Sequence, residues 1–154
     1  MTEPRYQNLK ASDMPVRREE GAIIRVFSGS SKGVKAPTLN HVPVTMVEMV
    51  LEPGASIVQD LPGSYNGFLY ILEGSGTFGA DATEGKAGQV LFLSRVENET
   101  ESEITVTAKE KLRLLLYAGE PINEPVVAYG PFVMNTQEEI RQAIRDYQEG
   151  KFVE

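Results

Sequence analysis

Short runs of β-forming residues, separated by turn residues, fill the chain from Ala22 to Ala118. In order, these runs are AIIRVFSG, VPVTMVEMVLEPG, SIVQDLPG, GFLYILEG, GTFG, QVLFL, SEITVTA and LRLLLYAG. In the second run, Val47, Met49 and Leu51 fall on one face. Glu48 falls on the other, and such alternation indicates a half-buried strand. The last run is apolar on both faces apart from one arginine, which predicts a strand covered on two sides. Strands at this spacing predict a sandwich or a barrel, and we favour the barrel.

The segment after these strands, residues 119–135, is rich in proline. Pro121, Pro125 and Pro131 lack the backbone N–H that an inner strand donates to its neighbour. We therefore predict an ordered connector here and not a pair of strands.

A helix is predicted over residues 136–150. Thr136 and Glu139 have the spacing of a capping box, in which each side chain bonds the backbone N–H of the other residue. An apolar stripe at positions i, i+3, i+4 and i+7 follows, made of Ile140, Ala143, Ile144 and Tyr147. Gly150 is placed to end the helix in the left-handed conformation. We expect the stripe to pack on the barrel.

The length and composition fit a single domain. The 154 residues, 41% of them hydrophobic, suffice for one substantial core but are too few for two ordinary domains. We expect an all-β domain with a short C-terminal α-helix. Its predicted parts are an N-terminal arm (1–20), the barrel (21–118), the connector (119–135) and the helix (136–150).

The charge and the amino terminus limit the partners of the chain. The 22 acidic and 15 basic residues give a formal net charge of −7, which opposes direct binding to DNA or RNA. There is no cysteine, so disulfides and thiolate sites are excluded. The first residues, MTEPRYQNLKASDMP, contain no apolar stretch, so no signal peptide or membrane helix is expected there. The expected location is the cytoplasm or the nucleus.

One glycine motif resembles a nucleotide-binding sequence. Residues 74–79, GSGTFG, match the G-x-G-x-x-G pattern and follow an apolar strand. In a dinucleotide site a helix begins directly after the glycines, but the following ADATEGKAGQV has no helical periodicity. We predict a hairpin turn instead.

The lone histidine, His41, lies in the loop-like stretch APTLNHVPV. A catalytic histidine needs a nucleophile and an orienting acid nearby, and the sequence indicates neither, so a solvated loop histidine is expected. With one histidine and no cysteine, a metal site would need mostly oxygen ligands. A tight iron or zinc site is therefore not expected.

Two stretches of the sequence resemble a known family. The first is EPRYQ near the start, and the second runs from AGEP and EPVV through YGPFVMNT to EEI and DY. Together they resemble the C-terminal half of the pirin family, and the likeness extends over residues 1–154. It rests most on the signature residues Gly130, Pro131, Phe132, Met134, Asn135 and Thr136. A pirin has two cupin barrels, so the resemblance implies one cupin-type double-stranded β-helix, or jelly-roll barrel.

This sequence keeps the glycine spacing of the cupin metal motif but not its metal-binding residues. Gly54 and Gly74 take its two end positions, but the ligand positions between them fall on Asp60, Pro62 and Gly67. Proline and glycine cannot bind a metal through a side chain. The second cupin motif places Glu99 at its histidine position. We therefore predict no catalytic, cofactor-binding or metal residues, with Asp60 and Glu99 as the only carboxylate candidates.

The resemblance implies a role without catalysis. In pirins the iron site belongs to the first barrel, on which the family's quercetin dioxygenase activity depends, so no cofactor is expected in this barrel. The predicted function is a non-catalytic module acting through protein contacts, and the resemblance to eukaryotic pirins implies a role as a nuclear transcription cofactor. We expect self-association, or binding of a protein partner, through the surface that normally meets the first barrel.

Two alternatives remain open. One is a metal-dependent dioxygenase or isomerase that uses Asp60 and Glu99 with Glu97 or Glu103, because a barrel interior can hold an oxygen-ligated ion. The other is a small-ligand pocket without chemistry. Its mouth would be lined by Tyr65, Phe68 and Tyr70, although aromatic residues in such positions are more often core residues.

Overall fold

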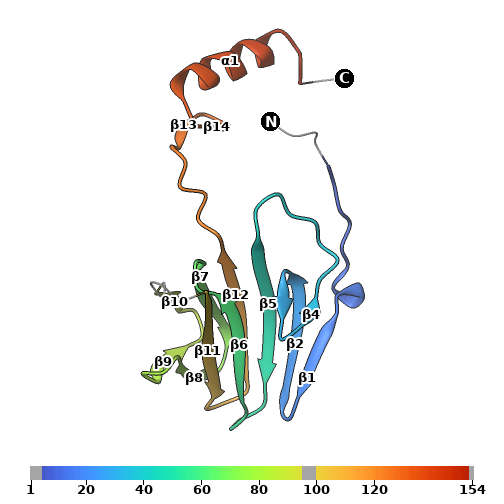
Figure 1. The fold of residues 1–154 in the computed structure, drawn as a ribbon, viewed down its shortest axis with the longest axis vertical. Helices are drawn as coiled ribbons and strands as arrows, with labels where there is room; N and C mark the ends of the chain where they lie inside the picture. The colour runs from blue at the N-terminus through green and yellow to red at the C-terminus, as the bar shows by residue number, and fades with distance from the viewer. Residues whose placement is uncertain (1–4, 95–99, 153–154) are drawn as a thin grey trace. The chain divides into compact units, whose positions relative to one another are not determined.

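The computed structural model describes residues 5–94 and 100–152. The chain divides into two compact units, Met1–Pro121 and Ile122–Glu154 (Figure 1). No helix in the described part of the chain is long and apolar enough to span a membrane.

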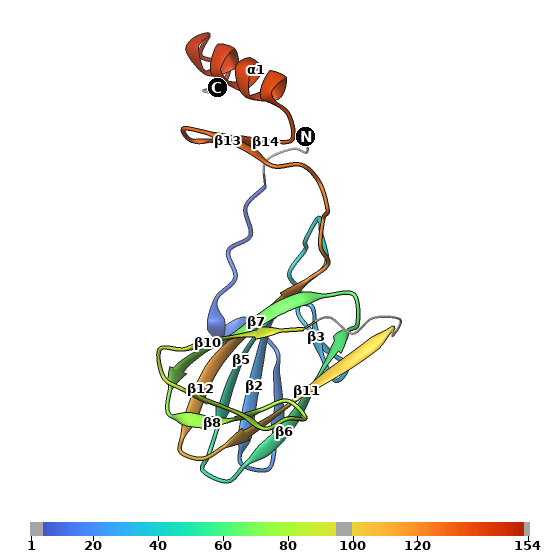
Figure 2. The ribbon, with the colours of Figure 1, turned by 90° about the vertical axis from the view of Figure 1, so that its left-hand side faces the viewer.

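The first unit is built from two antiparallel sheets that form the walls of the barrel (Figure 2). The larger sheet has the order β1 (Val16–Glu19), β2 (Ala22–Ser28), β5 (Val44–Leu51), β12 (Leu112–Gly119), β7 (Asn66–Glu73) and β10 (Val90–Leu93). The smaller sheet has the order β6 (Ser56–Pro62), β11 (Glu101–Ala108), β8 (Ser75–Phe78) and β9 (Thr83–Lys86). A short hairpin pairs β3 (Ser30–Ser31) with β4 (Val34–Lys35), and a 3-10 turn covers Ala11–Asp13. Strand β1 lies within the predicted arm, so the larger sheet begins at Val16.

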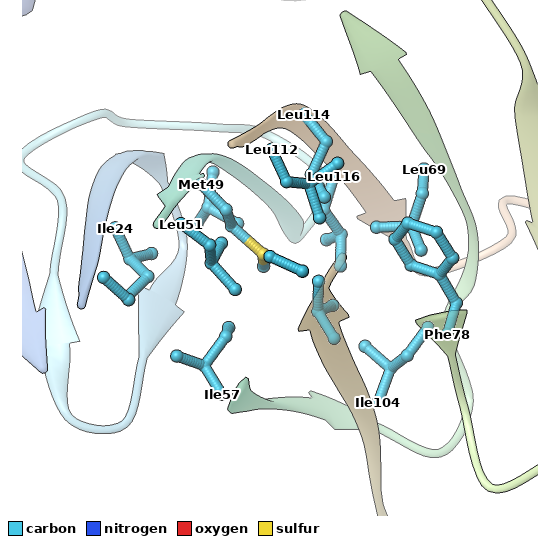
Figure 3. Close-up of a cluster of buried hydrophobic side chains, with 14 of the residues drawn as sticks. Ile24, Met49, Leu51, Ile57, Leu69, Phe78, Ile104, Leu112, Leu114 and Leu116 are labelled. Carbon is cyan, nitrogen blue, oxygen red and sulfur yellow. The ribbon is translucent and has the colours of Figure 1, made fainter. Parts of the chain in front are cut away.

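The core lies between the two sheets, where alternate side chains of each strand point inward (Figure 3). The predicted alternation in β5 is confirmed, since Val47, Met49 and Leu51 are fully buried. Strand β12 is covered less than predicted, because its inward leucines are fully buried while Leu115 and Tyr117 on the other face are only half-buried. One side of the larger sheet thus remains partly open.

The glycine motif at residues 74–79 forms strand β8 and the start of its turn into β9. No helix follows, so the predicted hairpin is confirmed and the motif is not a dinucleotide site.

In the second unit, the prediction of a connector without strands is wrong. Strands β13 (Val127–Tyr129) and β14 (Phe132–Met134) form a hairpin. Pro131 lies in its two-residue turn beside Gly130, which has a φ of 55°, and Pro125 precedes the first strand. Neither proline therefore occupies a position that must donate a ladder hydrogen bond.

The predicted helix is confirmed as α1 (Gln137–Gln148), with Thr136 as its N-cap and Glu139 completing the capping box. Gly150 has a φ of 74° and ends the helix in the left-handed conformation. Within the second unit α1 contacts the β13–β14 hairpin. Ile140 and Ala143 are buried, whereas Tyr147 is 66% exposed. Packing of the stripe on the barrel stays a prediction.

Candidate functional site

Two cavities in the first unit share a wall. The larger, about 820 Å³, is bordered by polar residues that include Ser30, Asp60 and Glu103, and we call it the polar cavity. The smaller, about 420 Å³, has seven leucine, isoleucine and phenylalanine residues among the fifteen that border it, and we call it the apolar cavity. The shared wall comprises Leu61, Tyr65, Ser102 and Glu103. These cavities are the places in the barrel where a ligand or a metal could be held.

The carboxylate of Asp60, at the first predicted ligand position, already accepts two hydrogen bonds. Its Oδ1 accepts hydrogen bonds from the backbone N–H of Lys32 at 2.7 Å and from Nε2 of Gln59 at 3.1 Å. Asp60 and Pro62 lie on the exposed face of β6, while Gln59 and Leu61 are buried on its other face. The Asp60 carboxylate therefore anchors the β3–β4 hairpin.

Gly67, at the third predicted ligand position, has no room for any side chain. A Cβ atom there would lie 2.7 Å from the carbonyl oxygen of Tyr117 and 2.9 Å from the Cβ of Ala118. Because the first contact is with the backbone of β12, a glutamate could enter only if the two strands moved apart.

The other carboxylate candidates do not complete a ligand set among the described residues. Glu97 and Glu99 lie outside the described residues. Glu103 faces Asp60 across the β6–β11 pair and is exposed. His41 lies exposed in the loop before β5. Across residues 5–94 and 100–152 no three histidines, cysteines or carboxylates group together to hold a metal, so these residues do not fit an iron site.

A buried polar network that the sequence analysis missed lies next to these positions. Arg17 Nη1 donates to Ser31 Oγ at 2.7 Å, and Ser31 Oγ donates to Gln59 Oε1 at 2.6 Å. Arg17 Nη2 also donates to the carbonyl oxygen of Val58 at 2.9 Å. All three side chains are buried, so the network joins β1, β3 and β6. The position of Gln59 in this network could have been predicted from the alternation in SIVQDLP, which puts Gln59 on the inward face together with Ile57.

Of the three aromatic residues predicted to line a mouth, only Tyr65 borders the cavities. Burial and the nearby negative charge of Glu120 raise the pKa of the Tyr65 phenol, so it stays protonated at neutral pH. Phe68 instead stacks on Tyr117 with ring centroids 5.2 Å apart, and Tyr70 is 39% exposed. Both point away from the core because odd-numbered residues of β7, such as Leu69, face inward.

The outward side of the larger sheet carries a continuous apolar surface. We call it the apolar outer face, and it comprises Met46, Phe68, Tyr70, Val90, Phe92, Leu115 and Tyr117. Phe92 is its most exposed member, at 83%. Next to this surface Glu48 pairs with Arg25 at 2.8 Å and with Arg113 at 2.7 Å. The sequence analysis missed this face, although VLFL in β10 is apolar at every position.

A comparison with known protein families shows the family of this barrel. The model of the Pirin C-terminal cupin domain matches residues 46–153. The chain belongs to the pirin family. The predicted resemblance and the cupin fold are therefore confirmed.

The chain spans about half the length of the curated pirins it matches. It is 42% identical to a pirin-like protein of Solanum lycopersicum, over 98% of this chain and 51% of that protein. It is 37% identical to pirin of Homo sapiens, over 98% of this chain and 52% of that protein.

Two solved structures are also similar to this chain, and it covers about half of each. Protein GK1651 from Geobacillus kaustophilus is 78% identical with a TM-score of 0.79, over 81% of this chain and 50% of that one. A structure titled quercetin 2,3-dioxygenase from Acinetobacter baumannii is 32% identical with a TM-score of 0.83, over 97% of this chain and 51% of that one.

Proposed function

We propose that this pirin-family barrel is a non-catalytic module that works through protein contacts, and that its partner is a second copy of the chain. The observation that carries the proposal is the apolar outer face, which lies on a barrel whose described residues do not form a metal site. Contiguous exposed apolar surface on a soluble domain marks an interaction site. The nuclear cofactor role that the family resemblance implies would also be a role in protein contacts.

The apolar outer face is organised as rows that cross the sheet. In one row Met46, Tyr117, Phe68 and Phe92 are direct cross-strand partners on β5, β12, β7 and β10. Phe68 lies 5.2 Å from Tyr117 and 6.5 Å from Phe92, measured between ring centroids. Such cross-strand contacts hold the rings in place, so the surface is already ordered before a partner binds.

A second copy is the occupant that we propose, because two like apolar faces can cover each other. The matched pirins contain about as many residues again outside the matched half, and these residues are available to cover such a face. In this chain the same face can be covered by the outer face of another copy. A two-fold pair buries identical surfaces against each other, which needs a face that is mostly apolar and nearly flat.

The test measures the mass of the chain in solution. Light scattering after gel filtration, from about 1 to 50 µM, should give a dimer for the unmodified chain and a monomer for Phe92→Glu, because a charge would be buried in the pair. Leu39→Glu is the matched control, since Leu39 is 63% exposed but lies outside the outer face, and it should remain dimeric. A monomeric mass for the unmodified chain over the whole range would contradict the proposal.

A second candidate function, a metal-dependent dioxygenase, is favoured by one observation, the similarity to the structure titled quercetin 2,3-dioxygenase. It would have to use Asp60 and Glu103 with Glu99. We expect the purified chain to contain less than about 0.1 iron, manganese or nickel atom per molecule, and to consume no oxygen with quercetin. Elemental analysis and an oxygen electrode check this expectation. Stoichiometric metal would overturn the non-catalytic assignment.

A further inference from the structure

The apolar cavity has the size and the walls of a small-molecule site. Its volume of about 420 Å³ falls within the range of about 300 to 1,000 Å³ that is typical of ligand pockets. Leu69, Phe78 and Ile104 on its wall are at least 92% buried, and Leu91 and Leu93 are half-buried. The inner part of the wall therefore consists of core side chains from both sheets, as Leu69, Phe78 and Ile104 show in Figure 3, and exposed residues form the rest.

Two hydroxyl groups on the shared wall can orient a ligand. The Tyr65 phenol stays protonated and can donate a hydrogen bond. Ser102 Oγ donates to the carbonyl oxygen of Leu61 at 3.2 Å, so its lone pairs can still accept. An apolar wall with a few polar groups on one side is the usual arrangement of a site for a flat molecule with one polar end.

The charges around the cavity select against anions. Asp81 and Glu103 border it, and the whole chain carries a net charge of −7. A bound anion would be placed near these carboxylates in a partly dehydrated space, where like charges repel most strongly. A neutral ligand avoids this repulsion.

We propose that the apolar cavity binds a neutral, flat aromatic molecule that carries a hydroxyl or carbonyl oxygen, with Tyr65 and Ser102 contacting that oxygen. This site needs no metal. It shares Phe92 with the apolar outer face, whereas Leu69, Phe78 and Ile104 on its wall lie in the core. Tyr65, Ser102 and Ile104 do not belong to the outer face, so binding in the cavity can be told apart from binding to that face.

The test uses 2-naphthol as the probe and the complete 154-residue chain. In ¹H–¹⁵N correlation spectra, 2-naphthol should shift the amide signals of Tyr65, Ser102 and Ile104 in a saturable manner. The anion 2-naphthalenesulfonate has the same ring system and should bind at least tenfold more weakly. Shifts confined to Tyr70, Val90 and Leu115, which belong to the apolar outer face and do not line the cavity, would place the probe on that face and would overturn the proposal.

Variants separate the cavity from general effects on folding. Leu91→Trp fills the apolar cavity, and Ser102→Trp fills the wall shared with the polar cavity, so each should weaken 2-naphthol binding at least tenfold. Ser56→Trp, on exposed β6 surface outside both cavities, is the matched control and should bind as the unmodified chain does. Tyr65→Phe keeps the ring but removes the donor, and should weaken binding about fivefold. Unchanged affinity in Leu91→Trp, with the fold retained in its spectrum, would contradict the proposal.

Discussion

At the scale of single residues, the carboxylate of Glu48 forms ion pairs with two arginines in the barrel. Its side chain is 10% exposed and lies between Arg25 and Arg113, which are 32% and 44% exposed. The hydrogen bond from Arg113 Nε to Glu48 at 2.9 Å, with the charge of this carboxylate, raises the pKa of Arg113 above its ordinary value. The two arginines lie on β2 and β12, on either side of β5, and the Glu48 carboxylate between them compensates both charges.

Glu48→Gln should lower the free energy of unfolding by about 1–2 kcal/mol, because two arginines would face each other without a compensating charge. The loss is smaller than the 3–5 kcal/mol typical of fully buried pairs, since both arginines reach solvent. Urea denaturation measures it. Glu73→Gln is the control, since Glu73 is 60% exposed and 3.5 Å from Arg113, and it should cause no measurable loss. Equal stability of the two variants would show that the Glu48 pairs contribute nothing.

At the scale of elements, the second unit shows which local signals are reliable. The capping box could be predicted from sequence because its two residues act on each other three positions apart. Thr136 N donates to Glu139 Oε2 at 2.9 Å, and Glu139 N donates to Thr136 Oγ1 at 3.2 Å. The β13–β14 hairpin was missed because the rule against proline in strands concerns inner strands, and this hairpin has only edges. Asn135, a signature residue, closes it by donating to the carbonyl oxygen of Pro125 at 2.8 Å.

Thr136→Ala should destabilise α1 by about 1 kcal/mol, because the N–H of Glu139 loses its acceptor at the start of the helix. Amide hydrogen exchange in the first two turns of α1 should become about fivefold faster. Thr136→Ser keeps the hydroxyl and should exchange at nearly the rate of the unmodified chain. If both variants exchange at the same rate, the cap contributes no stability.

At the scale of the whole molecule, the sequence predicted the barrel but not its surfaces. Periodicity in β5 and the pirin signature were sufficient for the fold. The apolar outer face was missed because it exists only after β5, β12, β7 and β10 are placed side by side, in an order that differs from their order in the chain. The candidate site was predicted in part, since Asp60 and Gly67 were named, but the engagement of Asp60 by Lys32 depends on a contact 28 residues away along the chain.

The proposed pair of chains should depend on salt. Each copy carries a formal charge of −7, so association works against electrostatic repulsion that dissolved ions screen. The dissociation constant of the dimer should fall at least threefold as sodium chloride is raised from about 20 to 300 mM, because the screening length shortens to several ångströms. Sedimentation equilibrium measures it. A dissociation constant that rises with salt would mean that ion pairs between copies, and not apolar contact, hold the dimer together.

The close approach of β7 to β12 at Gly67 also makes a metal ligand hard to introduce at the third predicted ligand position. A single mutation can restore a missing carboxylate where a side chain already stands, but here any side chain would collide with the carbonyl oxygen of Tyr117. Two core strands, β7 and β12, would first have to move apart. This rearrangement would lower the stability of the barrel before any side chain at position 67 could bind a metal. Changes on the surface of the barrel therefore cost less stability than the introduction of a metal ligand at position 67.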